Sequence, residues 1–400
     1  MGAAPPVESR LKHVVVALAL ILIPGAAAHG ATVTGLALPA GFTVKPEGVQ
    51  RLISIAPDHS VAALSESVDG TYRIRAFRWS PRGARSTFTP LPVLTAPDHG
   101  ASPGSRFVAG GIAAGLGTTY VSVAESFSGA YGGESFEVQR WVGRAALRWS
   151  LPACVHSGDE TDQHANAVDA NGRLALTIDV SGRGSFMVLS DGTGALAPYA
   201  FIVRGTRCRA LGRGIVLSVR DRWAAGYLGY LNGHPAATNI NLILQRPVAL
   251  RWRDTTKTAL GDGAAYAVAT DGFAVGATAV AGRFDSETTN FYGNPGRRYD
   301  SAIPHAIAWD AHGRRIALER GQVRSVAYDV SDGRTAIGTL QGAGGKHYAF
   351  RWRAGRLQRL DDLPHPAGWR FESAYAVAPD GTVAGIGTYR GVPTVFTWRE

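Results

Sequence analysis

The chain has few cysteines, few lysines and no long apolar run beyond its first 30 residues. No later stretch approaches the roughly twenty consecutive apolar residues that a membrane-spanning helix requires, so no membrane span is expected. The formal net charge is +10, yet no block of Lys or Arg resembles a nucleic-acid-binding patch, so nucleic acid is not an expected partner. Almost all of the basic charge is Arg. It remains open whether these Arg bind carboxylate or phosphate groups or only solvate the surface.

The common catalytic and metal-binding motifs are absent as well. There is no Gly-x-Ser-x-Gly, no His-Glu-x-x-His and no Asp-x-Asp-x-Asp loop, so no metal site and no cofactor are expected. Asp159, Glu160 and Asp162 precede His164. Because a glycosidase needs two carboxylates at a set separation, which spacing alone does not give, we expect a solvated loop there. These absences favour a binding protein over an enzyme.

Residues 1–28 have the pattern of a secretory signal peptide. Arg10, Lys12 and His13 precede the apolar run Val14–Ile23, and Ala26-Ala27-Ala28 offers a small-residue cleavage site. The apolar run is too short to span a bilayer. We therefore expect residues 29–400 to form one exported domain, either periplasmic or secreted.

A repeated unit dominates the remainder and is clearest at 327–352. An alternating apolar run meets Asp332-Gly333, a second apolar run follows, and Ala349-Phe350-Arg351-Trp352 comes after a Gly-rich gap. Asp-Gly between alternating runs predicts a tight hairpin in which Gly supplies a positive φ. A fourth short strand is expected at Arg356–Leu360. Four antiparallel strands in about 45 residues are typical of one propeller blade.

Further copies of this unit are marked by a strand that ends in Trp. They are Ala76–Trp79, Ala146–Trp149, Ala249–Trp252, Ala306–Trp309, Ala349–Trp352 and Val395–Trp398, with Ser185–Ser190 as a degenerate seventh. The matching turns are Asp58-His59, Asn171-Gly172, Asp271-Gly272, Asp332-Gly333 and Asp380-Gly381. The expected fold is all-β, a single β-propeller of four-stranded antiparallel blades, with seven blades favoured in a range from six to eight.

The last unit lacks a fourth strand, and residues 31–40 form a lone strand at the other end of the sequence. Gly35-Leu36-Ala37-Leu38 fits the missing place. We expect this N-terminal strand to complete the last blade and close the ring, because an open ring would leave a strand edge unpaired.

These residues resemble the HAF repeat, an extracellular bacterial repeat named after its His-Ala-Phe tripeptide. The likeness is carried best by His347–Trp352 and His305–Trp309, and it is clear from Tyr266 onward. The resemblance implies a secreted, β-propeller-like protein. It implies no particular chemistry.

Cys154 and Cys208 are the candidate pair for a disulfide. Two cysteines in an oxidising compartment are most simply bonded to each other. They bracket the unit in which Ser190 replaces the repeat Trp. A two-cysteine metal site lacks further ligands at a useful spacing.

Extra length lies between the second and third strands of some units. From Asp332 to Trp352 is 20 residues, but from Asp271 to Trp309 is 38. The fifth unit therefore carries an insertion at 282–301, and the second and fourth units are extended in the same gap. Connections of this kind lie on one face of a propeller, and insertions on one face often form the binding face.

The insertions supply the candidate ligand-binding residues. Aromatic faces, Arg and carboxylates suit a glycan or protein ligand, although long loops can also use aromatics to pack onto a blade edge. The candidates are Arg140, Trp141, Tyr227, Tyr230, Phe284, Asp285, Tyr292, Arg297, Arg298 and Tyr299. The Trp residues of the repeat and the Asp residues of its turns are expected to be structural. The expected function is a monomeric binding module. A glycan hydrolase or lyase and a structural or assembly module remain alternatives.

Overall fold

The computed structural model describes most of the chain after residue 30. The described ranges are 31–38, 40–44, 53–67, 74–82, 85–90, 106–126, 134–142, 145–148, 162–179, 199–204, 206–228, 248–280, 286–289, 295–298, 303–319 and 324–400. Residues 1–28 lie outside these ranges, so the signal peptide stays a prediction.

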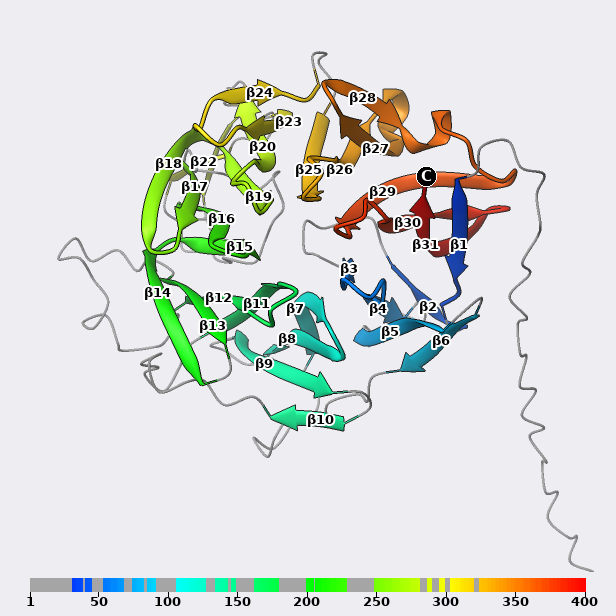
Figure 1. Ribbon diagram of the computed structural model, residues 1–400, viewed down its shortest axis with the longest axis horizontal. Helices are drawn as coiled ribbons and strands as arrows, with labels where there is room; N and C mark the ends of the chain where they lie inside the picture. The colour runs from blue at the N-terminus through cyan, green and yellow to red at the C-terminus, as the bar shows by residue number, and fades with distance from the viewer. Residues whose placement is uncertain are drawn as a thin grey trace, which may run out of the picture.

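The chain forms seven antiparallel β-sheets arranged around a common centre (Figure 1). We call these sheets blades one to seven. Because Asp-Gly turns separate short alternating runs, each blade is a meander whose first strand lies nearest the centre. The all-β seven-bladed propeller predicted from the repeat is confirmed.

The middle blades have four strands each, which follow one another from the centre outward. Blade two is β7 (Arg106–Gly115), β8 (Thr118–Ser126), β9 (Glu134–Val142) and β10 (Ala145–Arg148). Blade three is β11 (Asp162–Val168), β12 (Leu174–Asp179), β13 (Tyr199–Arg204) and β14 (Arg207–Arg213). Blade four is β15 (Ile215–Arg220), β16 (Trp223–Leu228), β17 (Val248–Arg253) and β18 (Thr256–Asp262). Blade five is β19 (Ala264–Val268), β20 (Ala274–Val280), β23 (Ile303–Trp309) and β24 (Arg315–Ala317). Blade six is β25 (Arg324–Val330), β26 (Ala336–Gln341), β27 (His347–Arg353) and β28 (Arg356–Arg359).

Three smaller elements accompany these sheets. The insertion of blade five contains a separate hairpin of β21 (Ser286–Thr289) and β22 (Pro295–Arg298). Two short 3₁₀ turns, η1 (Ala343–Gly345) and η2 (Leu360–Asp362), belong to blade six.

Blade one departs from the four-strand pattern. It contains β4 (Val61–Ser67), β5 (Ile74–Arg82) and β6 (Arg85–Pro90), and two short segments share the inner edge of β4. β3 (Ile53–Ile55) pairs with one half of β4, and β2 (Phe42–Thr43) pairs with the other.

Blade seven joins the two ends of the chain. Its inner strands are β29 (Trp369–Val377), β30 (Val383–Tyr389) and β31 (Val392–Arg399). The fourth is β1 (Thr32–Leu36), which pairs with β31 from Thr32 opposite Arg399 to Leu36 opposite Val395. The predicted closure by the N-terminal strand is therefore observed, with the strand beginning three residues earlier than Gly35.

Two third strands differ from the sequence assignment. In blade two the repeat Trp is Trp141 in β9, whereas Ala145–Arg148 forms the outer strand β10. The insertion there is consequently short, covering 127–133. In blade three the third strand is β13, and 185–190 lies outside the described residues. β13 carries Val203 at the place of Trp352, so no Trp marks it in the sequence.

The turns between first and second strands also differ from the tight primed turn predicted. In blade five, the Gly272 N–H donates to the Ala269 carbonyl (3.0 Å), and the Ala269 N–H donates to the Phe273 carbonyl (2.8 Å). The loop thus has three residues, of which only the last, Gly272, has a positive φ. In blade six this place is taken by Arg334, at φ 55°, rather than by Gly333.

A β-bulge recurs in the innermost strands of blades two to seven. One extra residue stands opposite the second strand at the same place in each. These residues are Gly110, Asn166, Leu217, Tyr266, Tyr328 and Tyr375. Beside the bulge of blade six lies Gly338, where an added Cβ would stand 1.9 Å from the Val326 carbonyl oxygen. Gly226, Gly276 and Gly385 are similarly crowded, which explains why glycine recurs at this place of the second strand.

The core lies between neighbouring blades. Phe273 of blade five stacks on Trp352 of blade six, with ring centroids 6.1 Å apart, and Val330 and Phe350 are buried in the same cluster. Because every blade buries its faces against two neighbours, the ring has a continuous apolar interior.

We predict that Gly338→Ala lowers the free energy of unfolding by about 3 kcal/mol, because the new methyl group collides with backbone that packing holds in place. Urea denaturation measures this. Gly333→Ala is the matched control, since its Cβ meets nothing closer than Ser331 Oγ at 3.7 Å. A loss for Gly338→Ala no larger than that of the control would contradict the role given to the bulge.

Candidate functional site

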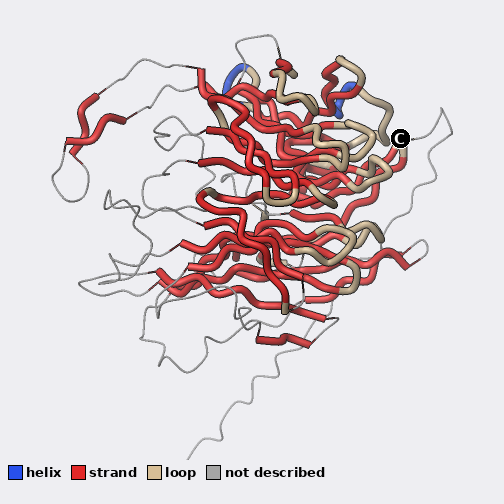
Figure 2. The backbone as a smooth tube through the Cα atoms, turned by 60° about the vertical axis from the view of Figure 1, so that its left-hand side comes forward, coloured by secondary structure: helices blue, strands red, loops and turns tan. Residues whose placement is uncertain are grey.

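The long connections between second and third strands lie on one face of the ring. They span 180–198 in blade three, 229–247 in blade four and 281–302 in blade five, where the strands on either side are antiparallel neighbours. The β21–β22 hairpin stands away from the ring on this side (Figure 2). We call this side the insertion face. The opposite side holds the first-to-second and third-to-fourth turns, and we call it the turn face.

The predicted ligand-binding residues separate into four groups, of which the last, Trp141 and Tyr227, is buried. Arg297 and Arg298 lie on β22, opposite Glu287 and Ser286 of β21. Arg140 is half-buried on β9 opposite Tyr120. Burial raises the pKa of Tyr120, and the positive charge of Arg140 partly offsets this rise. The remaining candidates on the insertions lie outside the described residues: Tyr230, Phe284, Asp285, Tyr292 and Tyr299.

Trp141 and Tyr227 lie in the core rather than on the insertion face. Each is 2% exposed. Trp141 packs between blades one and two as the repeat Trp of β9. Tyr227 packs among the inner strands with Leu217 and Tyr266. Neither offers a surface to a ligand, so both assignments are wrong. They failed because neither residue belongs to an insertion. The connection in blade two ends at residue 133, before Trp141, and the connection in blade four begins at residue 229, after Tyr227.

A row of tyrosines lines the inner strands of blades five, six and seven. The rings of Tyr266 and Tyr328 meet edge to face at 6.1 Å, and Tyr328 stacks on Tyr375 at 5.1 Å. All three occupy bulges. They were not predicted from the sequence, although each stands four or five residues before the Asp of its turn. Burial raises the pKa of Tyr375 to about 12.

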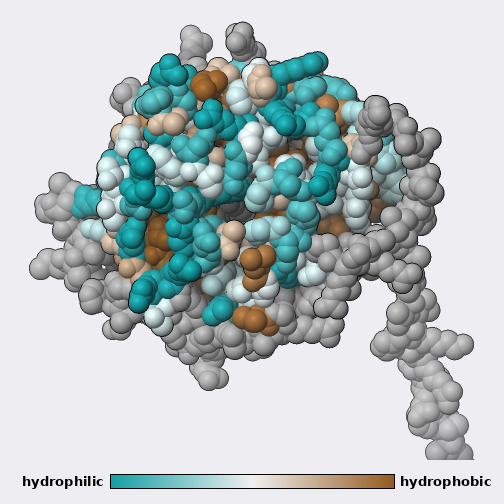
Figure 3. All heavy atoms as spheres, viewed as in Figure 1, coloured by the Kyte–Doolittle hydropathy of each residue, from teal (hydrophilic) through white to brown (hydrophobic). Residues whose placement is uncertain are grey.

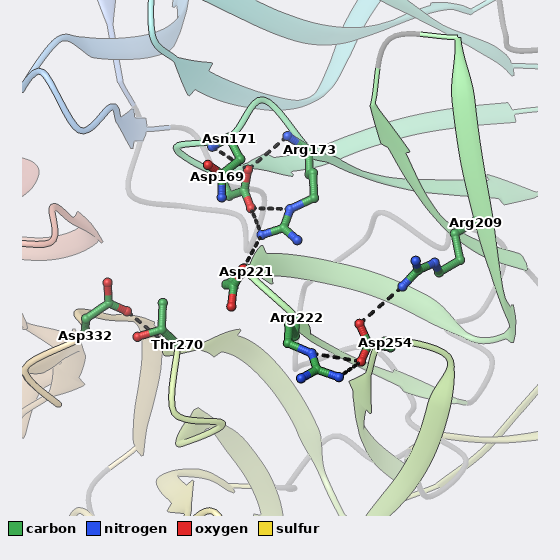
Figure 4. A network of polar contacts seen from close by, with 9 residues as sticks. All are labelled: Asp169, Asn171, Arg173, Arg209, Asp221, Arg222, Asp254, Thr270 and Asp332. Atoms are coloured by element: carbon green, nitrogen blue, oxygen red, sulfur yellow. Dashed lines mark hydrogen bonds and ion pairs between the residues drawn. The ribbon is translucent and has the colours of Figure 1, made fainter.

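Arg220 crosses the inner region from blade four to blades six and seven. Its guanidinium donates to the Val377 carbonyl at 3.2 Å and lies 3.7 Å from both Asp329 and Asp332. Asp329 also accepts the Val377 N–H at 3.0 Å, and Asp332 accepts the Thr270 N–H (Figure 4). Both carboxylates are therefore already engaged in holding the turns of different blades together.

The turn aspartates behave as local turn-forming groups. Asp58, Asp271 and Asp380 each accept the backbone N–H two residues later. Asp271 also pairs with Arg334 of the next blade, and Asp380 pairs with His59 across the closure. In the described ranges no three His, Cys, Asp or Glu side chains are grouped so as to hold a metal ion.

The Arg and Trp of the third strand hold neighbouring blades together, and we call them the Arg–Trp pair. Arg251 donates to the carbonyls of Gly272, Asp310 and Ala311 in the following blade at 2.6–2.8 Å. Trp252 Nε1 donates to the Leu211 carbonyl of the preceding blade at 3.1 Å. Burial lowers the pKa of Arg251, although nearby carboxylates oppose that shift. This Arg is structural and cannot contact a ligand.

Blade three also carries the disulfide. Cys208 in β14 is disulfide-bonded. Cys154, the only other cysteine, lies outside the described residues.

We predict that Arg251→Met lowers the free energy of unfolding by about 3 kcal/mol, because the buried Gly272 carbonyl and the partly buried Asp310 and Ala311 carbonyls lose their donor. Arg253→Met is the matched control, since Arg253 is exposed and lies over the same Trp223 ring. The control should cost about 1 kcal/mol or less. Equal losses, measured by urea denaturation, would show that Arg251 acts only through the Trp223 contact.

We predict that stability falls above pH 10 in part through Tyr375. In the unfolded chain Tyr375 is exposed and ionises near pH 10. In the folded chain its pKa is about 12, so the unfolded chain loses this proton at a lower pH than the folded chain does. The contribution is complete below about pH 10 and disappears as the pH approaches about 12. Tyr375→Phe should give a shallower decline in the free energy of unfolding between about pH 10 and 12. Parallel declines for the two proteins would contradict this.

Neither a family model nor a curated protein sequence matches the chain, so the resemblance to the HAF repeat stays a prediction. Solved structures with a similar arrangement are distant. The β-propeller domain of the Trilobed protease from Pyrococcus furiosus is 12% identical, with 86% of this chain and 93% of that chain covered and a TM-score of 0.47. Trypanosoma rangeli sialidase in complex with sialic acid is 10% identical, with 93% and 59% covered and a TM-score of 0.42. Aleuria aurantia lectin in complex with α-methyl-L-fucoside is 12% identical, with 81% and 100% covered and a TM-score of 0.32. The fold assignment rests on the strand pairing, and these likenesses add no argument about function. In the described ranges no helix has the length and apolar character needed to cross a membrane.

Proposed function

We propose that the chain is a non-enzymatic binding module that holds a glycan or a protein on its insertion face. One observation carries this proposal: the long connections of three blades all leave the ring on the same side. The equivalent connection is only 342–346 in blade six and Arg390-Gly391 in blade seven, so the fold itself does not need the extra length.

The chemistry of the blade-five insertion supports a polar ligand. Its β21–β22 hairpin brings Arg297 opposite Glu287, and Arg298 follows. Two tyrosines, two phenylalanines and two aspartates lie in the same insertion. Aromatic faces that stack on sugars and charged groups that bind hydroxyls or peptide groups are the usual components of such a surface.

The resemblance to the HAF repeat and the leader at 1–28 support an exported module, periplasmic or secreted, which we take to be monomeric. Hydrolysis or lysis of a glycan is the alternative activity, and a structural or assembly role is the alternative non-enzymatic one. The described carboxylates near the centre, Asp329 and Asp332, bind backbone and Arg220, which favours binding over catalysis.

We predict that replacing 281–302 with the residues of 342–346 abolishes ligand binding and leaves the fold intact. Both segments join two directly paired residues, Val280 with Ile303 and Gln341 with His347, so the graft meets equivalent strand ends. A thermal-shift panel of oligosaccharides and peptides identifies the ligand, because a ligand at 100 times its Kd adds about 2.7 kcal/mol of stability.

The same graft in place of 229–247 is the matched control, since Leu228 and Val248 are also paired. It tests whether blade four contributes. Binding that survives both grafts would refute the proposal. Turnover of the ligand would support the hydrolase or lyase, and concentration-dependent oligomers without any ligand response would support the assembly module.

A further inference from the structure

We propose that the turn face has a second binding surface, for an anionic glycan, at the outer rim of blades three and four. We call this surface the basic rim. It consists of Arg204, Arg207, Arg209, Arg222, Arg253 and Lys257, with Asp254 among them. It lies at the opposite ends of the strands from the insertions, and the proposal is independent of the function given to the insertion face.

The first observation is a like-charge pair. Arg204 and Arg207 stand directly opposite each other across the β13–β14 hairpin, and both are exposed. Side chains opposed in this way begin about 5 Å apart, and equal charges there destabilise the sheet. Within the described part of the chain neither has an ion pair. The arrangement costs stability in the free protein, and an anion bound between the two guanidinium groups would relieve it.

The same register recurs in other blades. Arg353 stands opposite Arg356 in blade six, and Arg82 stands opposite Arg85 in blade one. In blade six, however, Arg353 lies 3.6 Å from the Glu400 carboxylate. Blade three is therefore a place where such a pair is left uncompensated.

The second observation is that neighbouring cations extend the pair onto blade four. Arg209 of β14 reaches Asp254 in the next hairpin, at 3.3 Å, and Arg222 binds the same carboxylate from the other side (Figure 4). Arg253 and Lys257 flank that hairpin and are exposed. Six cations against one carboxylate leave this rim with a net charge of +5. The neighbouring Asp221 is paired with Arg173.

Asp254 shows how the basic rim binds a carboxylate. Its Oδ2 accepts from both Nε and Nη2 of Arg222, while its Oδ1 accepts from Nη1 of Arg209. These hydrogen bonds hold the pKa of Asp254 below its ordinary value. One carboxylate is thus shared by two guanidinium groups, and planar guanidinium groups suit carboxylate and sulfate oxygens. A uronic acid or sulfated sugar would bind to Arg204 and Arg207 in the same way.

The rim lacks what single-stranded nucleic acid requires. Base stacking needs an open aromatic face. Among the described residues, the ring near the hairpin is Trp223, which lies against Arg251 at 5.0 Å and Arg253 at 5.5 Å. The turn face, which is toward the viewer in Figure 3, is mainly hydrophilic and hollowed at its centre. The chemistry therefore favours an acidic polysaccharide.

The test measures binding of fluorescently labelled polygalacturonate to the full chain without its leader, by anisotropy, at low and high salt. Arg204→Glu with Arg207→Glu should weaken binding at least about tenfold, and salt should weaken binding to the unchanged protein, because the contacts are exposed ion pairs. Neither side chain makes a described hydrogen bond, so the fold should persist, as circular dichroism would verify.

Arg370→Glu with Arg390→Glu is the matched control. It changes the net charge equally, but both residues are exposed near the insertion face of blade seven. Its effect should be less than about twofold. Equal weakening by both pairs would overturn the proposal, as would absence of polygalacturonate binding at low salt. Tighter binding of single-stranded DNA than of polygalacturonate would also overturn it. The protein carrying both insertion-face grafts should still bind polygalacturonate, which separates this surface from the proposed function.

Discussion

The ring depends on hydrogen bonds between neighbouring blades. A blade made from short alternating strands has two apolar faces and cannot bury them alone. The Arg–Trp pair of the third strand holds a blade to both of its neighbours. Trp252 donates a hydrogen bond to the preceding blade, and Arg251 donates to the following blade. Arg78 repeats the forward contact in blade one, and Trp309 repeats the backward one in blade five. The repeated motif is therefore a joint between blades, and its charge is used inside the protein.

This use of Arg divides the basic charge into two populations. Buried Arg such as Arg251 and Arg351 are bound by the fold and are unavailable to a partner. The described exposed Arg at the third-to-fourth hairpins, such as Arg204 and Arg207, are not held by buried contacts of this kind. The buried population fits neither interpretation made from the sequence, because its guanidinium groups bind other parts of the fold instead of a ligand or solvent. The insertion face and the basic rim then lie at opposite ends of the same strands, so two ligands could be held by one rigid ring.

The sequence predicted the fold well, because a short turn and a Trp-ended strand recur in most of the units. The prediction failed where the repeat Trp was missing or duplicated. Val203 replaces it in blade three, and in blade two the ALRW sequence at 146–149 has the pattern of the third strand although it follows β9, which contains the repeat Trp141. Of the candidate site, sequence placed the insertions of blades four and five, but not the long connection of blade three or the burial of Trp141 and Tyr227. The tyrosine row and Arg220 depend on which strands meet at the centre, and spacing along the chain does not contain that information.

The pairing of β1 with β31 sets an order on assembly. Thr32 pairs with Arg399, so blade seven cannot be completed until the chain has been made as far as residue 399. Until then both strands keep an open edge, and such edges are where unwanted strand pairing begins. Non-local pairing of this kind is also slow to form. If residues 1–28 are a leader, as proposed, then β1 follows immediately after the site where that leader is removed. The strand that closes the ring would then be the segment next to the cleaved leader, and it has to stay unpaired throughout passage across the membrane.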